Sequence, residues 1–203
     1  MHGPVYRSRL RVMVEVIGPV LSDGDRVLDV GCGSGTLGRA LMDAHPKVQI
    51  EGLERVPRGG EAIPVTGYDG GSIPFDDDAF EVVIVADVLH HEQDPDRLLA
   101  ECARVAKRAV VVKDHQPQGP AWTLPYKRIC LMDWAANAPY GVPCLYRYPT
   151  AAQWREQFAR LGLGVAQEHT ELSLYPWPYR WVFTSGLQYL AVLKPGGAAP
   201  ARA

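Results

Sequence analysis

Residues 27 to 41 read VLDVGCGSGTLGRAL, a short apolar run that ends in three closely spaced glycines and continues into an amphipathic stretch. The glycines are Gly31, Gly33 and Gly35, so the loop has the pattern GxGxG. A buried strand, a glycine-rich turn and a helix in succession are typical of loops that bring a ligand close to the backbone. This loop is therefore the first candidate binding site, and its chemistry limits what the protein can do.

Two phosphate-binding patterns do not fit this loop. A P-loop requires GxxxxGK[ST], but Thr36 stands where that pattern needs a glycine, and no lysine is near. The dinucleotide fingerprint GxGxxG would place its third glycine at position 36, whereas the chain has Gly35. The carboxylate of Asp29 would repel a pyrophosphate but suits a ligand that carries an ammonium group. We expect glycine at all three positions because a Cβ there would occupy ligand volume.

Composition and charge limit the class of protein. The chain has 203 residues, 47% of them hydrophobic and 22% charged, which indicates one globular domain. Its formal net charge is -2 and no run of Lys and Arg exceeds two residues, so we expect no nucleic-acid partner. Residues 1 to 21 predict an amphipathic helix rather than a signal peptide, and no window is long and apolar enough for a membrane span. The four cysteines are far apart, without a CxxC pair, and indicate reduced thiols in the cytoplasm.

Strands and helices alternate along the first half of the chain. Apolar runs predict strands at residues 26 to 30, 47 to 54, 62 to 69, 79 to 87 and 109 to 113, with helices near 6 to 21, 35 to 45 and 95 to 108. Further along, the pattern predicts helices at residues 125 to 136 and after Thr150, and strands at 164 to 172 and 187 to 194. Alternation implies crossover connections, hence a mostly parallel sheet with helices on both faces and ligands at the carboxyl ends of its strands.

These elements predict an α/β fold of Rossmann-like, doubly wound type with a seven-stranded, mostly parallel sheet. We expect a single domain over residues 1 to 195 and a disordered tail over 196 to 203. Residues 114 to 149, dense in Pro, Trp, Tyr and Gly, predict an aromatic-rich lid inserted after the fifth strand.

Four motifs between about residues 25 and 113 resemble the class I S-adenosylmethionine-dependent methyltransferases. The first motif is an acidic residue followed by GxGxG, here LDVGCGSG with Asp29. Glu54 ends the second strand, where the family carries an acidic residue that binds both ribose hydroxyls. Asp69 matches the family carboxylate that receives the adenine amino group, and the amide of Gly70 would face the ring. The fourth-strand segment, AFEVVIVADVLHHEQDPDRLLAECARV, matches the region that lines the methionine side of the cofactor.

The resemblance implies S-adenosyl-L-methionine as the cofactor, without a metal ion. The cofactor-binding residues that it implies are Asp29, Gly31, Cys32, Gly33, Gly35, Glu54, Arg55, Asp69, Gly70, Asp87, Val88 and Leu89.

Histidines are the candidate bases for methyl transfer. A base is needed only when the acceptor must lose a proton, and His90, His91 and His115 lie near the carboxyl ends of predicted strands. We name His91 and His115 as candidate catalytic residues and prefer His115, because it would open the lid and face the acceptor. A metal site at Asp87, His90, His91 and His115 is the weaker alternative, since Asp87 is its one acidic residue and is assigned to the cofactor.

The aromatic segment bears on the acceptor. Its aromatic side chains are Trp122, Tyr126, Trp134, Tyr140, Tyr146 and Tyr148. They would form a lid over a flat, apolar acceptor, or else pack as a satellite core or a homodimer interface. The function that the residues favour is O- or C-methylation of a small molecule. Two alternatives stay open, an RNA or protein methyltransferase and a cofactor-binding module that has lost methyl transfer.

Overall fold

The computed structural model describes residues 3–57, 59–117, 119, 123–138, 141, 143–181 and 184–196. Its helices are α1 (Pro4–Ile17), α2 (Thr36–Ala44), α3 (Pro95–Val105), α4 (Leu124–Asn137) and α5 (Ala151–Arg160). Its strands are β1 (Arg26–Val30), β2 (Gln49–Glu54), β3 (Val65–Gly67), β4 (Phe80–Ala86), β5 (Ala106–His115), β6 (Gly164–His169) and β7 (Gln188–Lys194). Short 3-10 turns include η1 (Gly18–Val20) and η2 (Leu89–His91).

The strands form one sheet in the order β3-β2-β1-β4-β5-β7-β6. β1 to β5 are parallel to one another, and β7 runs antiparallel to both β5 and β6. The predicted seven-stranded, mostly parallel sheet is therefore confirmed. The strand order reverses between β1 and β4, which is where doubly wound sheets bind their ligands. The glycine loop follows β1 at this point.

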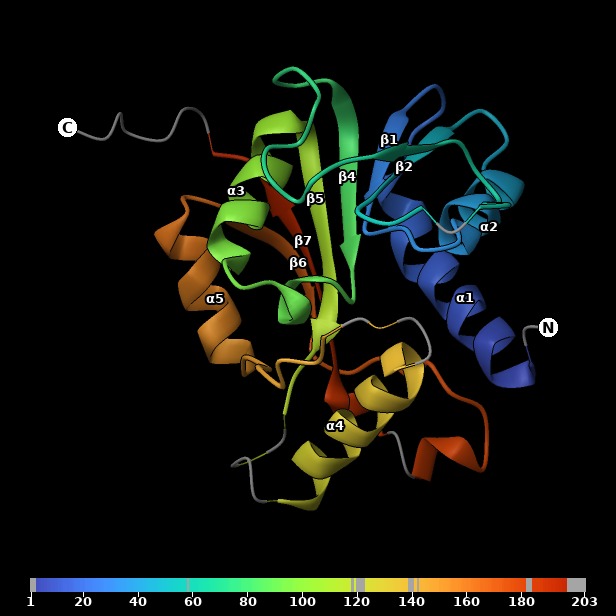
Figure 1. Cartoon of the computed structure of the whole chain (residues 1–203), viewed down its shortest axis with the longest axis vertical. Coiled ribbons are helices and arrows are strands. Elements are labelled where there is room, and N and C mark those ends of the chain that lie inside the picture. The colour runs from blue at the N-terminus through green and yellow to red at the C-terminus, as the bar shows by residue number, and fades with distance from the viewer. Residues whose placement is uncertain are drawn as a thin grey trace.

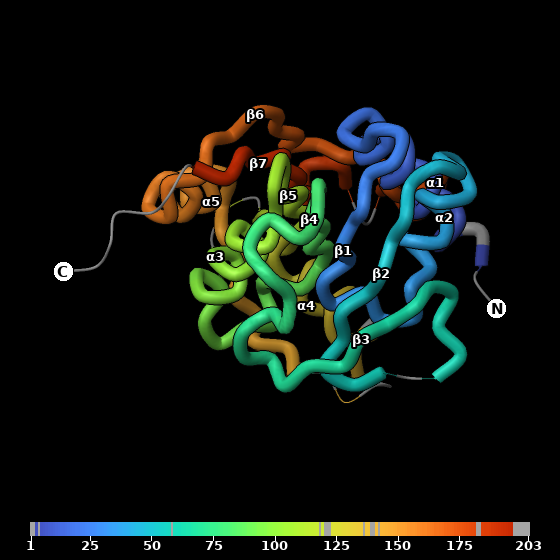
Figure 2. Tube along the Cα trace, turned by 90° about the horizontal axis from the view of Figure 1, so that it is seen from above, coloured from blue at the N-terminus to red at the C-terminus, as the bar shows by residue number. Residues whose placement is uncertain are grey.

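Helices cover both faces of the sheet, with α1 and α2 on one side and α3 and α5 on the other (Figures 1 and 2). Alternating residues of β4 contribute to the apolar cores on the two faces of the sheet. Val83 and Val85 belong to the apolar core under α3 and α5, whereas Val82 and Ile84 belong to the core under α1 and α2. All four side chains are fully buried, as expected for a central strand that is covered on both faces.

The predicted helix starts are confirmed. The Asp94 side chain accepts a hydrogen bond from the amide of Arg97 (3.0 Å) at the start of α3. Thr150 and Gln153 form a capping box at the start of α5. α1 is shorter than predicted, because it ends at Ile17 and the chain continues as the 3-10 turn η1. No helix in the described part of the chain is long and apolar enough to cross a membrane.

β5 is longer than predicted. It extends to His115, because Asp114 pairs with Tyr189 and His115 with Gln188 of β7. Residues 114 and 115 are therefore part of the sheet and do not begin an insertion. Of the aromatic residues assigned to the lid, Trp122 and Tyr140 lie outside the described residues, as does the predicted tail from residue 197 onward.

Candidate active site

The glycine loop joins β1 to α2 and has a left-handed backbone at each glycine. Gly31, Gly33 and Gly35 have φ of 68°, 57° and 70°, in a region that residues with a Cβ rarely adopt. The amide of Gly31 donates a hydrogen bond to the carbonyl of Leu53 (2.7 Å), which ties the loop to β2. The loop is therefore fixed in place by neighbouring backbone.

The structure corrects the reason given for two of these glycines. A Cβ at Gly31 would lie 2.4 Å from Val88 Cγ2, and a Cβ at Gly35 would lie 2.6 Å from Ile63 Cγ1. Both distances are shorter than side chains permit. Glycine is thus required at these positions because protein side chains, rather than a ligand, fill the adjacent space.

Asp29 lies beneath the glycine loop and is 2% exposed. Its Oδ2 atom has no hydrogen-bond partner among the described residues. Burial raises the pKa of Asp29 to about 7, although the positive charge of Arg9 opposes this rise. Buried polar atoms are normally hydrogen-bonded, so an unpartnered carboxylate oxygen beside a cavity indicates a place for a cationic ligand group.

The Glu54 carboxylate faces the glycine loop from the end of β2. Its Oε2 accepts a hydrogen bond from the amide of Gly33 (2.8 Å), and its Oε1 accepts one from the amide of Arg55 (2.9 Å). Each oxygen of a carboxylate can accept a second hydrogen bond. Glu54 therefore holds the loop and still has the capacity to bind hydroxyl groups.

The residues predicted for the adenine side lie beyond β2 and β3. Asp69 is exposed, and its Oδ1 accepts a hydrogen bond from the amide of Gly71 (2.7 Å). Arg55 forms an ion pair with Glu92 (2.7 Å), and its guanidinium packs against Gly70. Arg55 and Asp69 thus follow β2 and β3 at the edge of the sheet where the glycine loop follows β1.

Asp87, directly after β4, has an unusual backbone and two cationic partners. Its φ is 57°, which is rare for a residue other than glycine. Its carboxylate pairs with Lys113 of β5, which is fully buried, and with Arg9 of α1 (2.5 Å). Burial alone would raise the pKa of Asp87, but Lys113 and Arg9 hold it well below its ordinary value. The Asp87 carboxylate is therefore ionised and forms ion pairs with two cationic side chains.

Val88 and Leu89 direct their side chains at protein rather than at the cavity. Val88 packs against Gly31, and Leu89 is 2% exposed within the core under α3. If either residue contacts the methionine side of a cofactor, it does so through its backbone.

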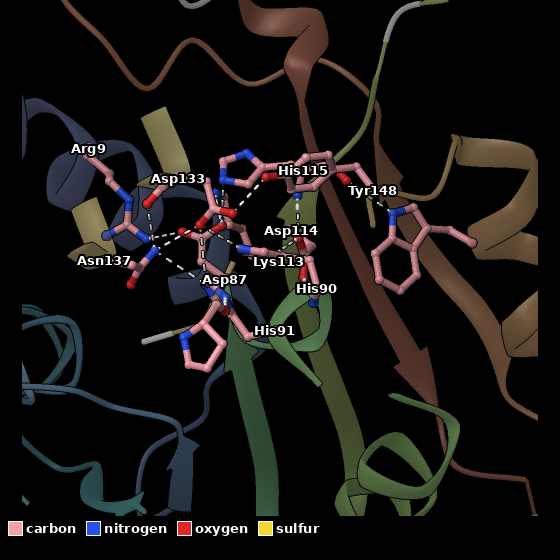
Figure 3. Close-up of polar contacts among 12 residues, drawn as sticks. Arg9, Asp87, His90, His91, Lys113, Asp114, His115, Asp133, Asn137 and Tyr148 are labelled. Atoms are coloured by element: carbon pink, nitrogen blue, oxygen red, sulfur yellow. Dashed lines mark hydrogen bonds and ion pairs between the residues drawn. The ribbon is translucent and has the colours of Figure 1, made fainter. Parts of the chain in front are cut away.

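A buried polar network connects η2, β5 and α4 (Figure 3). His90 Nδ1 donates to Asp114 Oδ1 (2.6 Å), and His90 Nε2 lies 3.4 Å from Asp133 Oδ1. Burial would lower the pKa of His90, but the two carboxylates raise it to about 10. Burial would raise the pKa of Asp133, but the neighbouring His90 imidazole and a hydrogen bond from Tyr148 lower it to about 2. In the absence of other ligands His90 is a cation between two carboxylates.

His91 extends this network toward the cavity. Its Nδ1 donates to the carbonyl of Pro143 (2.8 Å), and its Nε2 lies 3.3 Å from Asp133 Oδ1. The Asn137 amide donates to the same Asp133 oxygen (2.8 Å) and lies 3.3 Å from His91 Nε2. His91, Asp133 and Asn137 therefore converge on one point.

His115 lies at the end of β5, beside Asp87. Its Nε2 is 3.7 Å from Asp87 Oδ1, and its Nδ1 has no hydrogen-bond partner among the described residues. Burial, reinforced by the charge of Lys113, lowers the pKa of His115 to about 4. Its imidazole is therefore neutral at physiological pH.

These groups surround a cavity of about 480 Å3, a size typical of small-molecule sites. The predicted site residues that line it are Asp29, Gly31, Cys32, Gly33, Asp87, His91 and His115. The predicted residues outside its lining are Gly35, Glu54, Arg55, Asp69, Gly70, Val88 and Leu89. The cavity thus joins the glycine loop to the histidines.

The described Trp and Tyr side chains of the aromatic segment do not line the cavity, and Tyr126 and Tyr148 pack in a small apolar cluster with Ile129, which is the satellite-core alternative. Trp134 is 55% exposed, and Tyr148 is buried against His90 and Tyr126. α4 instead lines the cavity with Met132, Asp133 and Asn137, while Tyr6 and Tyr175 are the aromatic lining residues.

Sequence reasoning missed three charged residues of this region. Lys113 and Asp114 directly precede His115, where β5 ends, and the rule that ligands collect at the carboxyl ends of parallel strands could have identified them. Arg9 lies on α1, which the sequence presented as an amphipathic helix without chemical function. Nothing in its local pattern indicates that it would reach Asp87.

Comparison with known proteins assigns the family. Residues 6–168 match the family described as methyltransferase domain. The demethylmenaquinone methyltransferase of Renibacterium salmoninarum is 32% identical over 131 residues, which cover 60% of this chain and 54% of that protein. The ubiquinone/menaquinone biosynthesis C-methyltransferase UbiE of Bordetella avium is 34% identical over 96 residues, 41% of this chain and 38% of that protein. The chain thus spans about half or less of the length of these relatives.

A solved structure shows the same fold. The SAM-dependent methyltransferase of Aquifex aeolicus superposes with a TM-score of 0.64 at 18% identity, over 96% of this chain and 94% of that one. The family match and the fold agree with the strand order and the glycine loop described above. The chain belongs to the class I S-adenosylmethionine-dependent methyltransferases.

Proposed function

We propose that this protein transfers a methyl group from S-adenosylmethionine to an oxygen or carbon atom of a small aromatic acceptor. The observation that carries the proposal is the single cavity that joins the glycine loop to His91, Asp133 and His115. Cofactor and acceptor would occupy its two ends. The named activities of the curated relatives, which are quinone methyltransferases, support an aromatic acceptor.

The residues present fit the cofactor. The unpartnered Oδ2 of Asp29 is suited to its ammonium group, and Arg9, which also lines the cavity, is suited to its carboxylate. Glu54 retains hydrogen-bonding capacity for the ribose hydroxyls. When bound, S-adenosylmethionine supplies an electrophilic methyl group. The chain contributes chiefly by holding donor and acceptor in line, which removes much of the entropic cost of their encounter.

The histidines differ in what they can do for the acceptor. His115 is neutral and lines the cavity, so its imidazole is the candidate to receive a proton from an acceptor there. Its low pKa makes it a weak base, however, and a weak base is most effective with an acceptor whose proton is already acidic. A phenol or quinol meets this condition better than an aliphatic alcohol does.

A methyl-transfer assay tests the function. The protein is incubated with labelled S-adenosylmethionine and a panel of phenols, quinols, tRNA and protein extracts. We expect label to pass to an aromatic small molecule. Transfer to tRNA with a steep salt dependence would favour an RNA methyltransferase, and cofactor binding without transfer to any acceptor would favour a binding module.

A further inference from the structure

Three side chains bring potential metal-ligating atoms together at the acceptor end of the cavity. They are His90 and His91 of η2 and Asp133 of α4 (Figure 3). One imidazole nitrogen of each histidine and one carboxylate oxygen of Asp133 all lie within 4.8 Å of one another. His90 and Asp133 are buried, and His91 is partly exposed toward the cavity.

The distances within this cluster suit a shared ion better than direct hydrogen bonds. Asp133 Oδ1 lies 3.4 Å from His90 Nε2 and 3.3 Å from His91 Nε2. Both separations exceed the usual range of about 2.7 to 3.2 Å for a nitrogen–oxygen hydrogen bond. Two ligands at about 2.0 to 2.2 Å from a tetrahedral zinc ion lie about 3.3 to 3.5 Å apart. The two nitrogen–oxygen distances match this geometry.

Hydrogen bonds behind the cluster aim its atoms at a common centre. His90 Nδ1 donates to the Asp114 carboxylate (2.6 Å), and His91 Nδ1 donates to the Pro143 carbonyl (2.8 Å). In both rings Nε2 is therefore the nitrogen directed at Asp133. Histidines that ligate metals almost always donate their other ring N–H to a carboxylate or a backbone carbonyl in this way.

Asp133 is anchored similarly. Its Oδ2 accepts a hydrogen bond from the Tyr148 hydroxyl (2.7 Å), so its Oδ1 faces the two imidazoles. The Asn137 amide donates to that Oδ1 (2.8 Å).

We propose that His90, His91 and Asp133 bind a zinc ion whose remaining coordination position opens into the cavity. Two imidazoles and one carboxylate favour zinc over magnesium or calcium, which prefer oxygen ligands. Three protein ligands and one open position are typical of catalytic zinc sites. This set differs from the one considered from the sequence, because Asp87 is paired with Lys113 and Arg9 instead.

The role of the ion rests on the proposed function, whereas its binding does not. An acceptor hydroxyl bound at the open position would lose its proton more readily, because zinc lowers the pKa of a bound oxygen. That proton would pass to His115, which lines the same cavity.

Zinc binding by the purified protein tests the proposal without cofactor or acceptor. Metal-free protein is titrated with zinc chloride against a chromophoric chelator, and the thermal unfolding temperature is measured with and without zinc. We expect one zinc ion per chain and an increase in the unfolding temperature. His91→Ala and Asp133→Asn should each weaken binding by about 100-fold or more, since a lost ligand should cost at least as much as a lost supporting hydrogen bond.

His169→Ala is the matched control, because His169 at the end of β6 is a histidine outside both the cavity lining and the cluster. It should bind zinc as the unaltered protein does. Thermal unfolding of each metal-free variant shows whether it is folded. Absence of stoichiometric zinc binding, or equal binding by folded His91→Ala and the unaltered protein, would overturn the proposal and leave the cluster as an ionic bridge only. Because the assay omits methyl transfer, this outcome is distinct from failure of the proposed function.

Discussion

The carboxylate of Glu54 accepts a hydrogen bond of 2.8 Å from the amide of Gly33, so the end of β2 is bound directly to the glycine loop after β1. The same carboxylate was expected from the sequence to bind ribose hydroxyls. The two functions are compatible, because a carboxylate oxygen accepts more than one hydrogen bond. Substitution of Glu54 tests the second function.

Replacement of Glu54 by alanine should weaken binding of S-adenosylhomocysteine, the demethylated cofactor, by roughly 1.5 to 3 kcal/mol. The reason is the loss of charge-assisted hydrogen bonds to the ribose. Glu54→Gln keeps an acceptor for the amide of Gly33 but removes the charge, and should have an intermediate effect. Calorimetry measures both affinities, and unchanged affinity in both variants would remove Glu54 from the cofactor site.

The pKa of Asp29 predicts a pH dependence of stability. The folded pKa of about 7 lies above the unfolded value of about 3.9. The folded state therefore binds one more proton between these values, and the free energy of unfolding falls as the pH rises through about 4 to 7, by at most about 4 kcal/mol. Urea unfolding at several pH values measures this slope. Asp29→Asn should remove it, while Asp23→Asn, at an exposed site, should not.

Cofactor binding should depend on the same carboxylate. If the ammonium group pairs with ionised Asp29, binding below about pH 7 releases a proton. Calorimetry in buffers with different enthalpies of ionisation would detect that release in the unaltered protein. The hypothesis fails if Asp29→Asn releases as many protons.

Lys113 should contribute strongly to stability, because it is fully buried and pairs with Asp87. Lys113→Met leaves the Asp87 carboxylate with Arg9 as its remaining cationic partner and should cost about 3 kcal/mol of unfolding free energy, the lower end of the range for broken buried pairs. The double variant, Lys113→Met with Asp87→Asn, should lose less unfolding free energy than the sum of the losses in the two single variants. Arg39→Met, which breaks the exposed Arg39–Asp43 pair, should leave stability unchanged. Additive effects of the two buried changes would contradict the pairing.

The contact between Gly31 and Val88 can be tested by paired substitutions. Gly31→Ala should destabilise the protein through both a left-handed backbone and a clash with Val88. Gly24 is a control for the backbone alone, since its φ is 87° and a Cβ there meets no atom within 4 Å. Gly24→Ala should cost about 1 to 2 kcal/mol, and Gly31→Ala more. If Val88→Ala does not reduce the additional destabilisation that Gly31→Ala causes relative to Gly24→Ala, the clash with Val88 is not the cause of that difference.

The sequence was sufficient to predict the sheet and the glycine loop because both depend on local patterns. Apolar runs, Asp94 and Thr150 mark strands and helix starts through interactions within a few residues. The network around His90 could not be predicted in this way. Asp114 and Asp133 lie 24 and 43 residues from His90 in the sequence, and only the tertiary fold brings β5 and α4 to the two sides of its ring. Likewise, Arg9 and Asp87 are hydrogen-bonded although they lie 78 residues apart in the sequence.

The longer extent of β5 explains why the assignment of His115 to a lid was wrong. The apolar run ends near Lys113, and the polar residues that follow resemble the start of a loop. Their pairing with β7, which lies more than 70 residues later, keeps them in the sheet. His115 therefore lies on a rigid strand beside the cavity, which suits a residue that must hold a fixed position.

His115 remains the candidate base, and substitution tests it against His91. His115→Ala should lower kcat by about 100-fold or more on the acceptor found in the panel, with the affinity for S-adenosylhomocysteine nearly unchanged. The reason is that the neutral imidazole of His115 lines the cavity, whereas His91 Nε2 already contacts Asp133 and Asn137. Steady-state kinetics separate kcat from KM, and thermal unfolding shows whether each variant is folded. If His115→Ala keeps nearly full kcat while His91→Ala loses it, the base is not His115. If both variants keep nearly full kcat, neither histidine is catalytic, and positioning alone accounts for transfer.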